Sequence, residues 1–475
     1  MLHIYSAAQR SNDGHRCMIA PSPEIREIMV KELDRLRGLT DNKVLANMLT
    51  PKQPARVGFN DGLVVPGKVF PLGTSAATVR MHSSRRNMLR GTLRVAVVLV
   101  DFPDKKFSQQ NAHFEDLFFS GKKGSVRHYF KEVSNNLIDI DGEVVGPFMM
   151  PKKITTYANG ASGTGDPLPN ARTMASDAAK AALPEIDFGQ YDNDDDGYVD
   201  AFVVIHAGSG AEQTMNPNDI WSHKWILPEV LDGDNTNIYA YLTVPEDCKL
   251  GVCVHELGHL LFGFPDLYDT DGSTAGVGDW CLMGSGSWND GGDTPAHPCA
   301  WCKVQQGWSF VANQVKNEER VKIAPVQKGN LVYRLWKEGL QGNEYFLVEN
   351  RQQSRYDRFI PASGLLIWHI DDNIDSNSNE FHYKVALMQA DGRKDLESRK
   401  NNTGDEGDPF PGAEGNTVFN KNSNPSSLSY GGLDTGVQVM NISEGGEVVT
   451  ADLFVSTRRP RVVRKTTRKK KEEEQ

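Results

Sequence analysis

Apolar runs and helical spacings alternate along the chain from residue 91 to about residue 315. The run from Leu93 to Val100 is almost continuously apolar, which is typical of a strand buried on both faces. Asn170 precedes a stretch with helical spacing and suits the N-cap of a helix. The order of segments predicts an α+β domain in which helices back a mixed sheet. The expected strands are 93–100, 137–145, 199–206 and 238–244, and the expected helices are 125–134 and 171–182.

Beyond about residue 315 the pattern changes to short strands separated by turn-rich loops. A helix over 296–306, ended by Gly307, comes just before this change. The close spacing of the strands predicts an all-β sandwich with antiparallel strands over residues 315–456. The expected strands are 321–326, 331–336, 345–350, 365–370, 383–389, 437–442 and 448–454.

The two ends of the chain differ from its middle. Residues 24–49 predict a charged helix, and residues 50–92 are rich in Pro, Gly, Ser and Arg, as in an exposed linker open to cleavage. We interpret residues 1–90 as a propeptide-like segment, with a small structural cap on the next domain as the alternative. Residues 457–475 hold nine Lys or Arg against three Glu and predict a disordered basic tail.

Composition narrows the class of protein. The 475 residues are 39% hydrophobic and 24% charged, as in a soluble globular protein of two or three domains. No apolar run approaches the ~20 residues that a membrane span needs. The net charge of −10, more negative still without the basic tail, argues against nucleic acid as a main partner. We expect a monomer without a membrane span, and the first residues lack the apolar core of a secretory signal.

The segment HELGH carries the clearest chemistry. On a helix, His255 and His259 stand one turn apart on the same face, within ~6 Å, and so can share one zinc ion. Glu256 lies beside that position and is placed to take a proton from a water molecule that the zinc acidifies. The pattern predicts metal-assisted hydrolysis of peptide bonds, with Glu256 as general base. An ordinary amphipathic helix is the alternative for such a short motif.

The residues after the helix support the zinc interpretation. Gly263 and Pro265 are helix-ending signals, so the chain turns and brings Asp266 back toward the metal as a candidate third ligand. The segment from Gly278 to Gly286 looks like the methionine-containing turn, or Met-turn, beneath the zinc of metzincin proteases. Met283 is the candidate methionine.

The segments HELGH, FPDLYD and DWCLM together resemble the immune inhibitor A type of metalloprotease. The similarity covers about residues 91–455 and implies a metzincin-like catalytic domain at 91–314, zinc held by two histidines and an aspartate, and a secreted protein. In the metzincin pattern the third ligand follows the second histidine at a fixed spacing, whereas Asp266 stands one residue later. Asp269 is therefore the second candidate for this ligand.

A run of acidic residues precedes the strand at 199–206. Asp192, Asp194, Asp196 and Asp200, with glycine at the sixth position, match the first half of a calcium-binding loop. The twelfth position is Val203 rather than glutamate, which excludes a complete EF-hand. We expect a calcium site at these four aspartates, with a solvated acidic turn as the alternative.

The six cysteines suggest three roles. Cys253 and Cys281 flank the zinc helix and the Met-turn, which meet in the implied fold, so we expect them to form the disulfide in an oxidising compartment. Cys299 and Cys302 form a CxxC pair, which we interpret as two half-buried helix cysteines rather than a redox or metal motif. Cys17, far upstream, is a candidate zinc ligand that keeps the enzyme latent, with a free thiol near a disordered terminus as the alternative.

The main prediction is a zinc endopeptidase acting on proteins or peptides. A strand near 238–244 could align an extended substrate by strand addition. The alternative is a catalytically inert, zinc-containing binding protein that engages its target through the β-sandwich.

Overall fold

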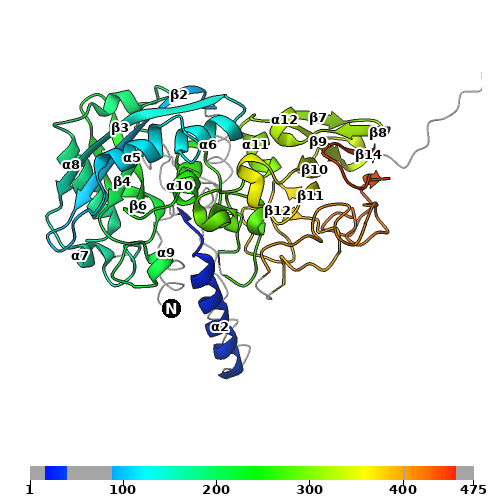
Figure 1. Ribbon diagram of the computed structural model, residues 1–475, viewed down its shortest axis with the longest axis horizontal. Coiled ribbons are helices and arrows are strands. Elements are labelled where there is room, and N and C mark those ends of the chain that lie inside the picture. The colour runs from blue at the N-terminus through cyan, green and yellow to red at the C-terminus, as the bar shows by residue number, and fades with distance from the viewer. Residues whose placement is uncertain (1–16, 40–87, 166, 271, 399–401, 456–475) are drawn as a thin grey trace, which may run out of the picture.

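The computed structural model describes residues 17–39 and 88–455, apart from 166, 271 and 399–401. Two halves lie side by side in Figure 1, one built around a six-stranded sheet and the other around two smaller sheets. Most of the expected 50–92 linker and all of the expected tail lie outside these residues. No helix in the described part of the chain combines the length and apolarity that a membrane span requires.

The six-stranded sheet has the order β1-β5-β6-β4-β2-β3. Strands β2, β3, β4 and β6 run parallel to their neighbours in this group, whereas β5 is antiparallel to β6 and β1 is antiparallel to β5. The bounds are β1 Cys17–Met18, β2 Gly91–Asp101, β3 Ile138–Met149, β4 Phe202–His206, β5 His223–Asp232 and β6 Asn237–Pro245. The expected strand near 238–244 is therefore an inner strand, and β5 lies closer to the edge.

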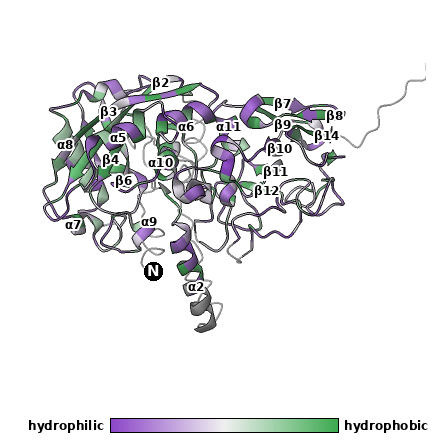
Figure 2. Ribbon diagram, in the orientation of Figure 1, coloured by the Kyte–Doolittle hydropathy of each residue, from purple (hydrophilic) through white to green (hydrophobic). Residues whose placement is uncertain are grey.

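Alternate residues of β2 enter two different hydrophobic cores. Val95 and Val97 pack in the core that contains the zinc-motif helix, while Ala96 and Val98 pack in the core on the opposite face. The expectation of a strand buried on both faces is confirmed. Figure 2 shows hydrophobic residues concentrated along the strands of this sheet.

Helices cover both faces of the sheet. Helices α5 (Asn111–Phe119), α6 (Val126–Val133) and α10 (Leu250–Phe262) pack in one core, and α7 (Ile154–Ala158) and α8 (Ala171–Ala182) in the other. Asn170 caps α8 as expected, because its side chain accepts a hydrogen bond from the Arg172 amide at 3.0 Å. The short elements are α9 (Ala211–Thr214), η1 (Phe188–Tyr191), η2 (Gly278–Trp280) and η3 (Ser285–Gly292).

The second half contains a five-stranded sheet in the order β12-β11-β10-β9-β7 and a three-stranded sheet in the order β13-β14-β8. All of their strand pairs are antiparallel except β7 with β9, which is parallel and departs from the expected pattern. The strands are β7 Phe310–Gln314, β8 Glu318–Ile323, β9 Leu331–Trp336, β10 Glu344–Arg351, β11 Gly364–Asp371, β12 Val385–Leu387, β13 Gln438–Met440 and β14 Val449–Phe454. The short helices here are α12 (Val326–Gly329), η4 (Lys337–Gly339) and η5 (Arg355–Phe359).

The five-stranded sheet has a hydrophobic core on each face. Phe346 and Val348 of β10 face the three-stranded sheet, whereas Leu347 faces the same core as the zinc-motif helix. Helix α11 (Ala300–Gln305), shorter than the expected 296–306, lies in that shared core between the halves. The two halves are thus joined by apolar packing.

A buried ion pair of the second half contacts the first half. Arg351 donates to Asp357, and Asp357 in turn accepts a hydrogen bond of 2.9 Å from the amide of His297. Burial alone would raise the pKa of Asp357, but Arg351 overrides it and holds that pKa at about 2.

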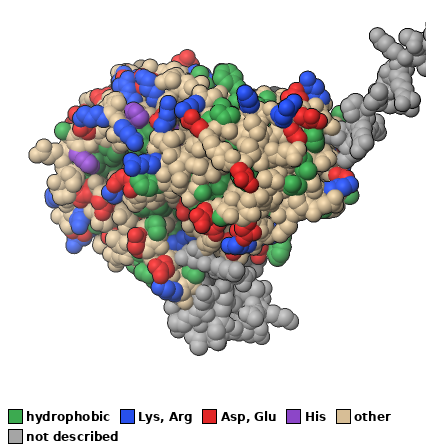
Figure 3. Space-filling view, turned by 45° about the vertical axis from the view of Figure 1, so that its right-hand side comes forward, with side chains coloured by type: hydrophobic (Ala, Val, Ile, Leu, Met, Phe, Trp, Pro, Cys, Tyr) green, Lys and Arg blue, Asp and Glu red, His purple; other side chains and the backbone are tan. Residues whose placement is uncertain are grey.

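On the surface, Lys and Arg side chains are interspersed with Asp and Glu over the face in Figure 3.

The N-terminal helix is α2, Pro23–Leu39, which is shorter than the expected 24–49 because residues from 40 onward lie outside the described part. It projects from the underside of the molecule in Figure 1. The strand β1 just before it joins the six-stranded sheet, so residues 17–22 run along the body that contains α10.

Candidate metal centre

Helix α10 carries the three residues of the zinc motif on one buried face. The side chains of His255, Glu256 and His259 are fully buried. The Nε2 atoms of the two histidines lie 3.0 Å apart, with the rings roughly perpendicular. The helical spacing thus brings both imidazoles to one point, as the sequence predicted.

Backbone carbonyls fix the orientation of both imidazole rings. Nδ1 of His255 lies 2.9 Å from the Leu282 carbonyl, and Nδ1 of His259 lies 2.5 Å from the Phe264 carbonyl. Each Nδ1 must carry the proton to donate to a carbonyl, so each Nε2 presents a lone pair. This arrangement suits metal ligation, in which the outer nitrogen of a ligating histidine is held by such a partner.

The end of α10 brings Asp266 to the histidines. Gly263 closes the helix with φ +64°, and its amide and that of Phe264 bond back to the carbonyls of His259 and Gly258. The reversed chain places Oδ1 of Asp266 at 3.3 Å from His255 Nε2 and 3.2 Å from His259 Nε2. Burial by itself would raise the pKa of Asp266, but the histidines lower it.

Three acceptor atoms therefore converge where a cation would sit. Ligand atoms around a tetrahedral zinc, each at ~2.0–2.1 Å from the metal, lie ~3.3–3.4 Å from one another. The three observed separations of 3.0, 3.2 and 3.3 Å are close to this geometry. Two imidazoles and a carboxylate are also ligand types that zinc prefers, so the residues fit the metal.

Asp269, the second candidate for the third ligand, faces a different partner. Its Oδ2 accepts hydrogen bonds from the Ser273 hydroxyl at 2.8 Å and from the Thr274 amide and hydroxyl at 3.0 and 2.7 Å. These contacts brace the loop after α10. The group that converges on one point consists of His255, His259 and Asp266.

Met283 lies against the metal-motif helix. A Cβ added to Gly258 would come 3.1 Å from the Met283 sulfur. The absence of a side chain at Gly258, which lies between His255 and His259, therefore lets Met283 pack closely against α10. Met283 is fully buried, and its carbonyl accepts a hydrogen bond of 2.8 Å from the Leu267 amide. Leu282 and Met283 thus both contact α10, one through the carbonyl that orients His255 and the other through its side chain.

Glu256 follows His255 directly on α10, and its carboxyl group is buried. Among the described residues, neither oxygen of its carboxyl group has a hydrogen-bond partner. Burial raises the pKa of Glu256 well above its usual value, and the charge of Asp266 raises it further. The charge of Lys224 and the backbone of Ile19 act to lower the pKa of Glu256.

The N-terminal segment occupies the edge of the sheet next to Glu256. Cys17 pairs with Lys224 and Met18 with His223, and the Ile19 amide donates to the Ser222 carbonyl at 3.2 Å. Three side chains of the body donate to carbonyls of this segment: Tyr268 to Met18 at 2.7 Å, Trp221 to Ile19 at 2.9 Å and Trp288 to Ala20 at 2.8 Å. Tyr268 and Trp221 come from loops and Trp288 from η3, and no sequence pattern indicated them as donors.

A second buried carboxyl group, Glu212, was also missed by the sequence interpretation. It lies on the short helix α9, and its carboxylate accepts hydrogen bonds from the Ser222 hydroxyl at 2.6 Å and the Ser222 amide at 3.0 Å. Its backbone carbonyl accepts a bond of 3.1 Å from the Ser22 amide. Burial raises the pKa of Glu212 to about 7, although the bonds from Ser222 act to lower it.

The acidic loop brings together three of the four expected calcium ligands. Carboxylate oxygens of Asp192, Asp194 and Asp200 lie within 4.8 Å of one another. Asp196 is exposed, and its carboxylate accepts a hydrogen bond from the Tyr198 amide at 2.9 Å. Asp196 therefore lies outside the group that the loop gathers.

The neighbours of Cys253 and Cys281 differ from the expectation. The sulfur of Cys253 lies 3.4 Å from that of Cys248, whereas Cys281 lies beside Cys299 and Cys302. The expected disulfide between Cys253 and Cys281 is wrong, because α10 turns Cys253 toward the residues before the helix. Cys299 and Cys302 are fully buried rather than half-buried.

Comparison with known proteins shows which family this part of the chain is similar to. Residues 90–311 match the family described as immune inhibitor A peptidase M6, catalytic domain. The chain is 28% identical over 335 residues to the pre-pro-metalloprotease PrtV of Vibrio cholerae, covering 58% of this chain and 36% of that protein. It is 30% identical over 250 residues to immune inhibitor A of Bacillus thuringiensis, covering 41% of this chain and 36% of that protein. Each match thus spans about a third of the relative's length. Residues 90–311 thus resemble the catalytic domain of the immune inhibitor A-like family of metalloproteases.

Proposed function

We propose that the protein is a zinc endopeptidase that cleaves peptide bonds in proteins. The observation that carries the proposal is the convergence of His255, His259 and Asp266 on one point beside the buried carboxyl of Glu256, whose oxygens accept no hydrogen bond from the described residues. The similarity of residues 90–311 to a metalloprotease family supports the same activity. The inert binding protein is not favoured, because the residues needed for hydrolysis are together.

The roles of the residues follow from their positions. His255, His259 and Asp266 would hold the zinc, which would act as a Lewis acid toward the substrate carbonyl and acidify a water molecule. Glu256 takes the proton of the attacking water and returns it to the leaving amine. A pKa raised by burial, as for Glu256, suits a group that must both accept and release a proton.

The sheet edge at β5 suggests how a substrate binds. β1 now pairs there as a short antiparallel strand, and an extended peptide could make the same pairing once this edge is free. Tyr268, Trp221 and Trp288 would then donate to the substrate's backbone carbonyls as they now do to residues 18–20. This edge replaces the inner strand near 238–244 that the sequence suggested.

The test is the loss of activity without the loss of zinc. Glu256→Gln should bind zinc as the parent does and digest casein at least ~10²-fold more slowly, the lower end of the effect of removing a general base. Glu115→Gln, the same change at an exposed position on α5, is the matched control and should keep full activity. Both variants and the parent are compared after the same processing of the N-terminal segment. Casein digestion by Glu256→Gln at the parent's rate would overturn the proposal.

We further propose that the chain divides as the sequence suggests. Residues 91–314 would be a metzincin-like catalytic domain, 315–456 a β-sandwich, and 1–90 a propeptide-like segment. The two-sheet arrangement around one core supports the sandwich. The grouping of Asp192, Asp194 and Asp200 supports a calcium site, completed by other oxygen ligands.

The N-terminal segment is proposed to keep the enzyme latent, with Cys17 as the zinc ligand that blocks the open position. The support is the course of the backbone: β1 lies on the edge beside Glu256, and Ile19 and Ala20 are buried there. A thiolate is a strong zinc ligand and would exclude the water that hydrolysis needs. Cleavage in the linker, for which the Arg-rich stretch 85–90 is the candidate, would release the segment.

A further inference from the structure

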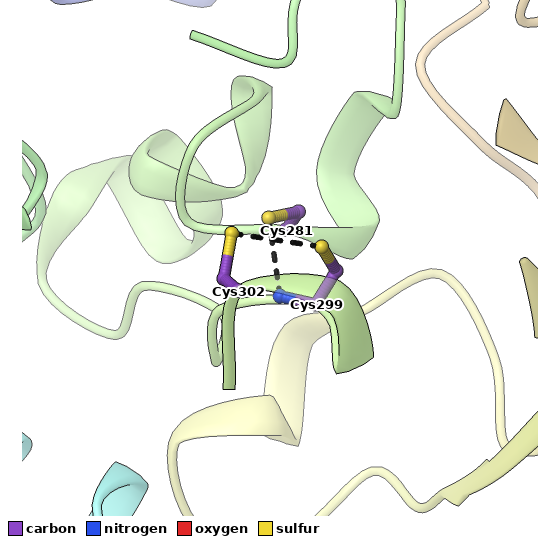
Figure 4. A group of neighbouring side chains, drawn as sticks. All are labelled: Cys281, Cys299 and Cys302. Carbon is purple, nitrogen blue, oxygen red and sulfur yellow. Dashed lines mark hydrogen bonds between the residues drawn. The ribbon is translucent and has the colours of Figure 1, made fainter. Parts of the chain in front are cut away.

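Three cysteine side chains meet in a second buried cluster, away from the histidines. Cys281, Cys299 and Cys302 are fully buried, and one sulfur from each lies within 4.8 Å of the other two. Cys281 follows η2, while Cys299 and Cys302 stand at the start and in the first turn of α11. Figure 4 shows the three sulfurs turned toward one another across the gap between these two segments.

The spacing of the sulfurs suits a shared metal ion. Thiolates that bind one ion at ~2.3 Å lie ~3.8–4.0 Å from one another. The sulfurs of Cys299 and Cys302 are 3.7 Å apart, close to this value, and the sulfur of Cys281 lies within 4.8 Å of both. A disulfide would join only two of the sulfurs at ~2.0 Å and leave the third thiol buried beside it.

The surroundings of Cys281 favour a thiolate there. The amides of Met283 and Cys299 both donate to its sulfur, at 3.4 and 3.2 Å. A neutral thiol is a weak acceptor, so two backbone donors directed at one sulfur match a negatively charged ligand better than a thiol. Thiolates buried in this way need a cation nearby, because an unpaired buried charge is costly.

We propose that Cys281, Cys299 and Cys302 bind one thiophilic cation, Zn²⁺ or Cu⁺, at a site separate from the histidine centre. Sulfur ligands select these closed-shell ions over the hard cations that prefer oxygen. Binding releases the protons of the thiols to solvent. The ring of nearby His297 is already engaged, by Glu132 at 3.1 Å and Lys303 at 2.8 Å, so the described residues offer three sulfur ligands.

The position of the site assigns it a structural role. Cys281 directly precedes Leu282, whose carbonyl orients His255, and Met283, which lies under α10. Trp301 of α11 donates to Asp372, just beyond β11, at 2.9 Å. A metal bound to the three cysteines would therefore link the segment Gly278–Gly286 to α11, the helix that precedes the second half. The inference does not depend on the proposed peptidase activity.

The experiment measures metal at this site alone. The full chain carrying His255→Ala and His259→Ala, which removes the histidine ligands, is purified under reducing conditions and freed of metal by a chelator. Co²⁺, a spectroscopic probe for zinc sites, is added to one portion, and Cu⁺ is added anaerobically to another. We expect one ion per chain and thiolate-to-cobalt charge-transfer absorption in the near ultraviolet. Loss of this absorption on adding Zn²⁺ identifies zinc as the ion, and binding of Cu⁺ alone identifies copper.

Variants decide whether the cysteines are the ligands. Cys281→Ser and Cys302→Ser, each in the same background, should weaken binding by more than about 100-fold, beyond the loss that changes outside the ligand shell produce. Cys248→Ser alters a buried cysteine outside the cluster and should bind as the background does. If Cys281→Ser does not fold, judged by circular dichroism, Cys302→Ser decides the result.

Three outcomes would overturn the site. They are failure of the background protein to retain either metal, binding that is unchanged in both serine variants, and a disulfide among the three cysteines found by mass spectrometry of the protein purified without reductant.

Discussion

At the scale of single residues, the third metal ligand is the most informative position. Asp266 and Asp269 are three residues apart, yet one points to the histidines and the other to Ser273 and Thr274. We expect Asp266→Asn to lose zinc, because an amide is a poorer ligand and carries no charge. Asp269→Asn should keep zinc and instead lower the melting temperature through its weakened loop contacts.

Zinc content per chain, measured after gel filtration, and thermal melting distinguish the two variants. The assignment fails if Asp269→Asn loses the metal while Asp266→Asn retains it. The matched chemistry of the two substitutions makes each the control for the other.

Glu212 gives a prediction for pH dependence. Its pKa is about 7 in the folded protein against 4.5 for an ordinary glutamate, so the folded state binds the proton more tightly. The stability this provides is fully present below pH 4.5 and is lost as the pH rises to 7. The loss amounts to about 3 kcal/mol for a shift of this size, as an order of magnitude.

The variant Glu212→Gln cannot lose a proton there and should keep its stability over that range. We expect the melting temperature of the parent, relative to that of Glu212→Gln, to fall between pH 4.5 and pH 7. A constant difference across this range would show that Glu212 does not titrate in it.

At the scale of elements, β1 provides the test of latency. If Cys17 blocks the metal, the uncut variant Cys17→Ala should digest casein without processing, whereas the uncut parent should not. After cleavage and removal of the segment, the parent and the variant should have equal activity, which serves as the control. Equal activity of the two uncut proteins would rule out the cysteine as the blocking ligand.

The acidic loop at 192–200 provides a second prediction at this scale. Carboxylates packed within 4.8 Å repel one another until a divalent ion neutralises them. With zinc buffered, replacing EGTA by calcium should raise the melting temperature of the parent. Asp200→Asn should show a smaller increase, while Asp196→Asn, outside the group, should behave like the parent. An unchanged melting temperature in the parent would remove the calcium site.

The sequence predicted the elements whose own pattern is strong. β2 is a long apolar run, and α8 has both a capping residue and helical spacing, so their existence depends little on neighbours. β1 has only two residues and β5 contains Pro228 and charged side chains, so neither has a clear period. Their strand geometry comes from pairing with each other and with β6, which a single segment cannot reveal.

The same limit applies to the candidate site. His255, Glu256 and His259 lie on one helix, where spacing alone determines which side chains meet. Asp266 required the geometry of the turn after α10, and Glu212 and the three cysteines required contacts between segments distant in sequence. Local periodicity carries no information on such contacts.

At the scale of the whole molecule, the boundary near residue 314 does not separate two independent cores. β7 precedes that boundary and pairs with β9 of the second half, while one face of β10 packs in the core of α10. The Arg351–Asp357 pair and α11 also lie where the two halves meet. The division by sequence pattern therefore marks a change of architecture more than a break in packing.

The sheet shared by two cores limits how the catalytic half could be transplanted. A fragment cut at the boundary would lose the β10 and β11 side chains of the core that it shares with α10, and would expose apolar residues of that core to water. Domain shuffling, in evolution or by recombinant fusion, would have to carry the five-stranded sheet along with the histidine centre. The smallest portable unit is thus the pair of halves, even though the chemistry resides in only one of them.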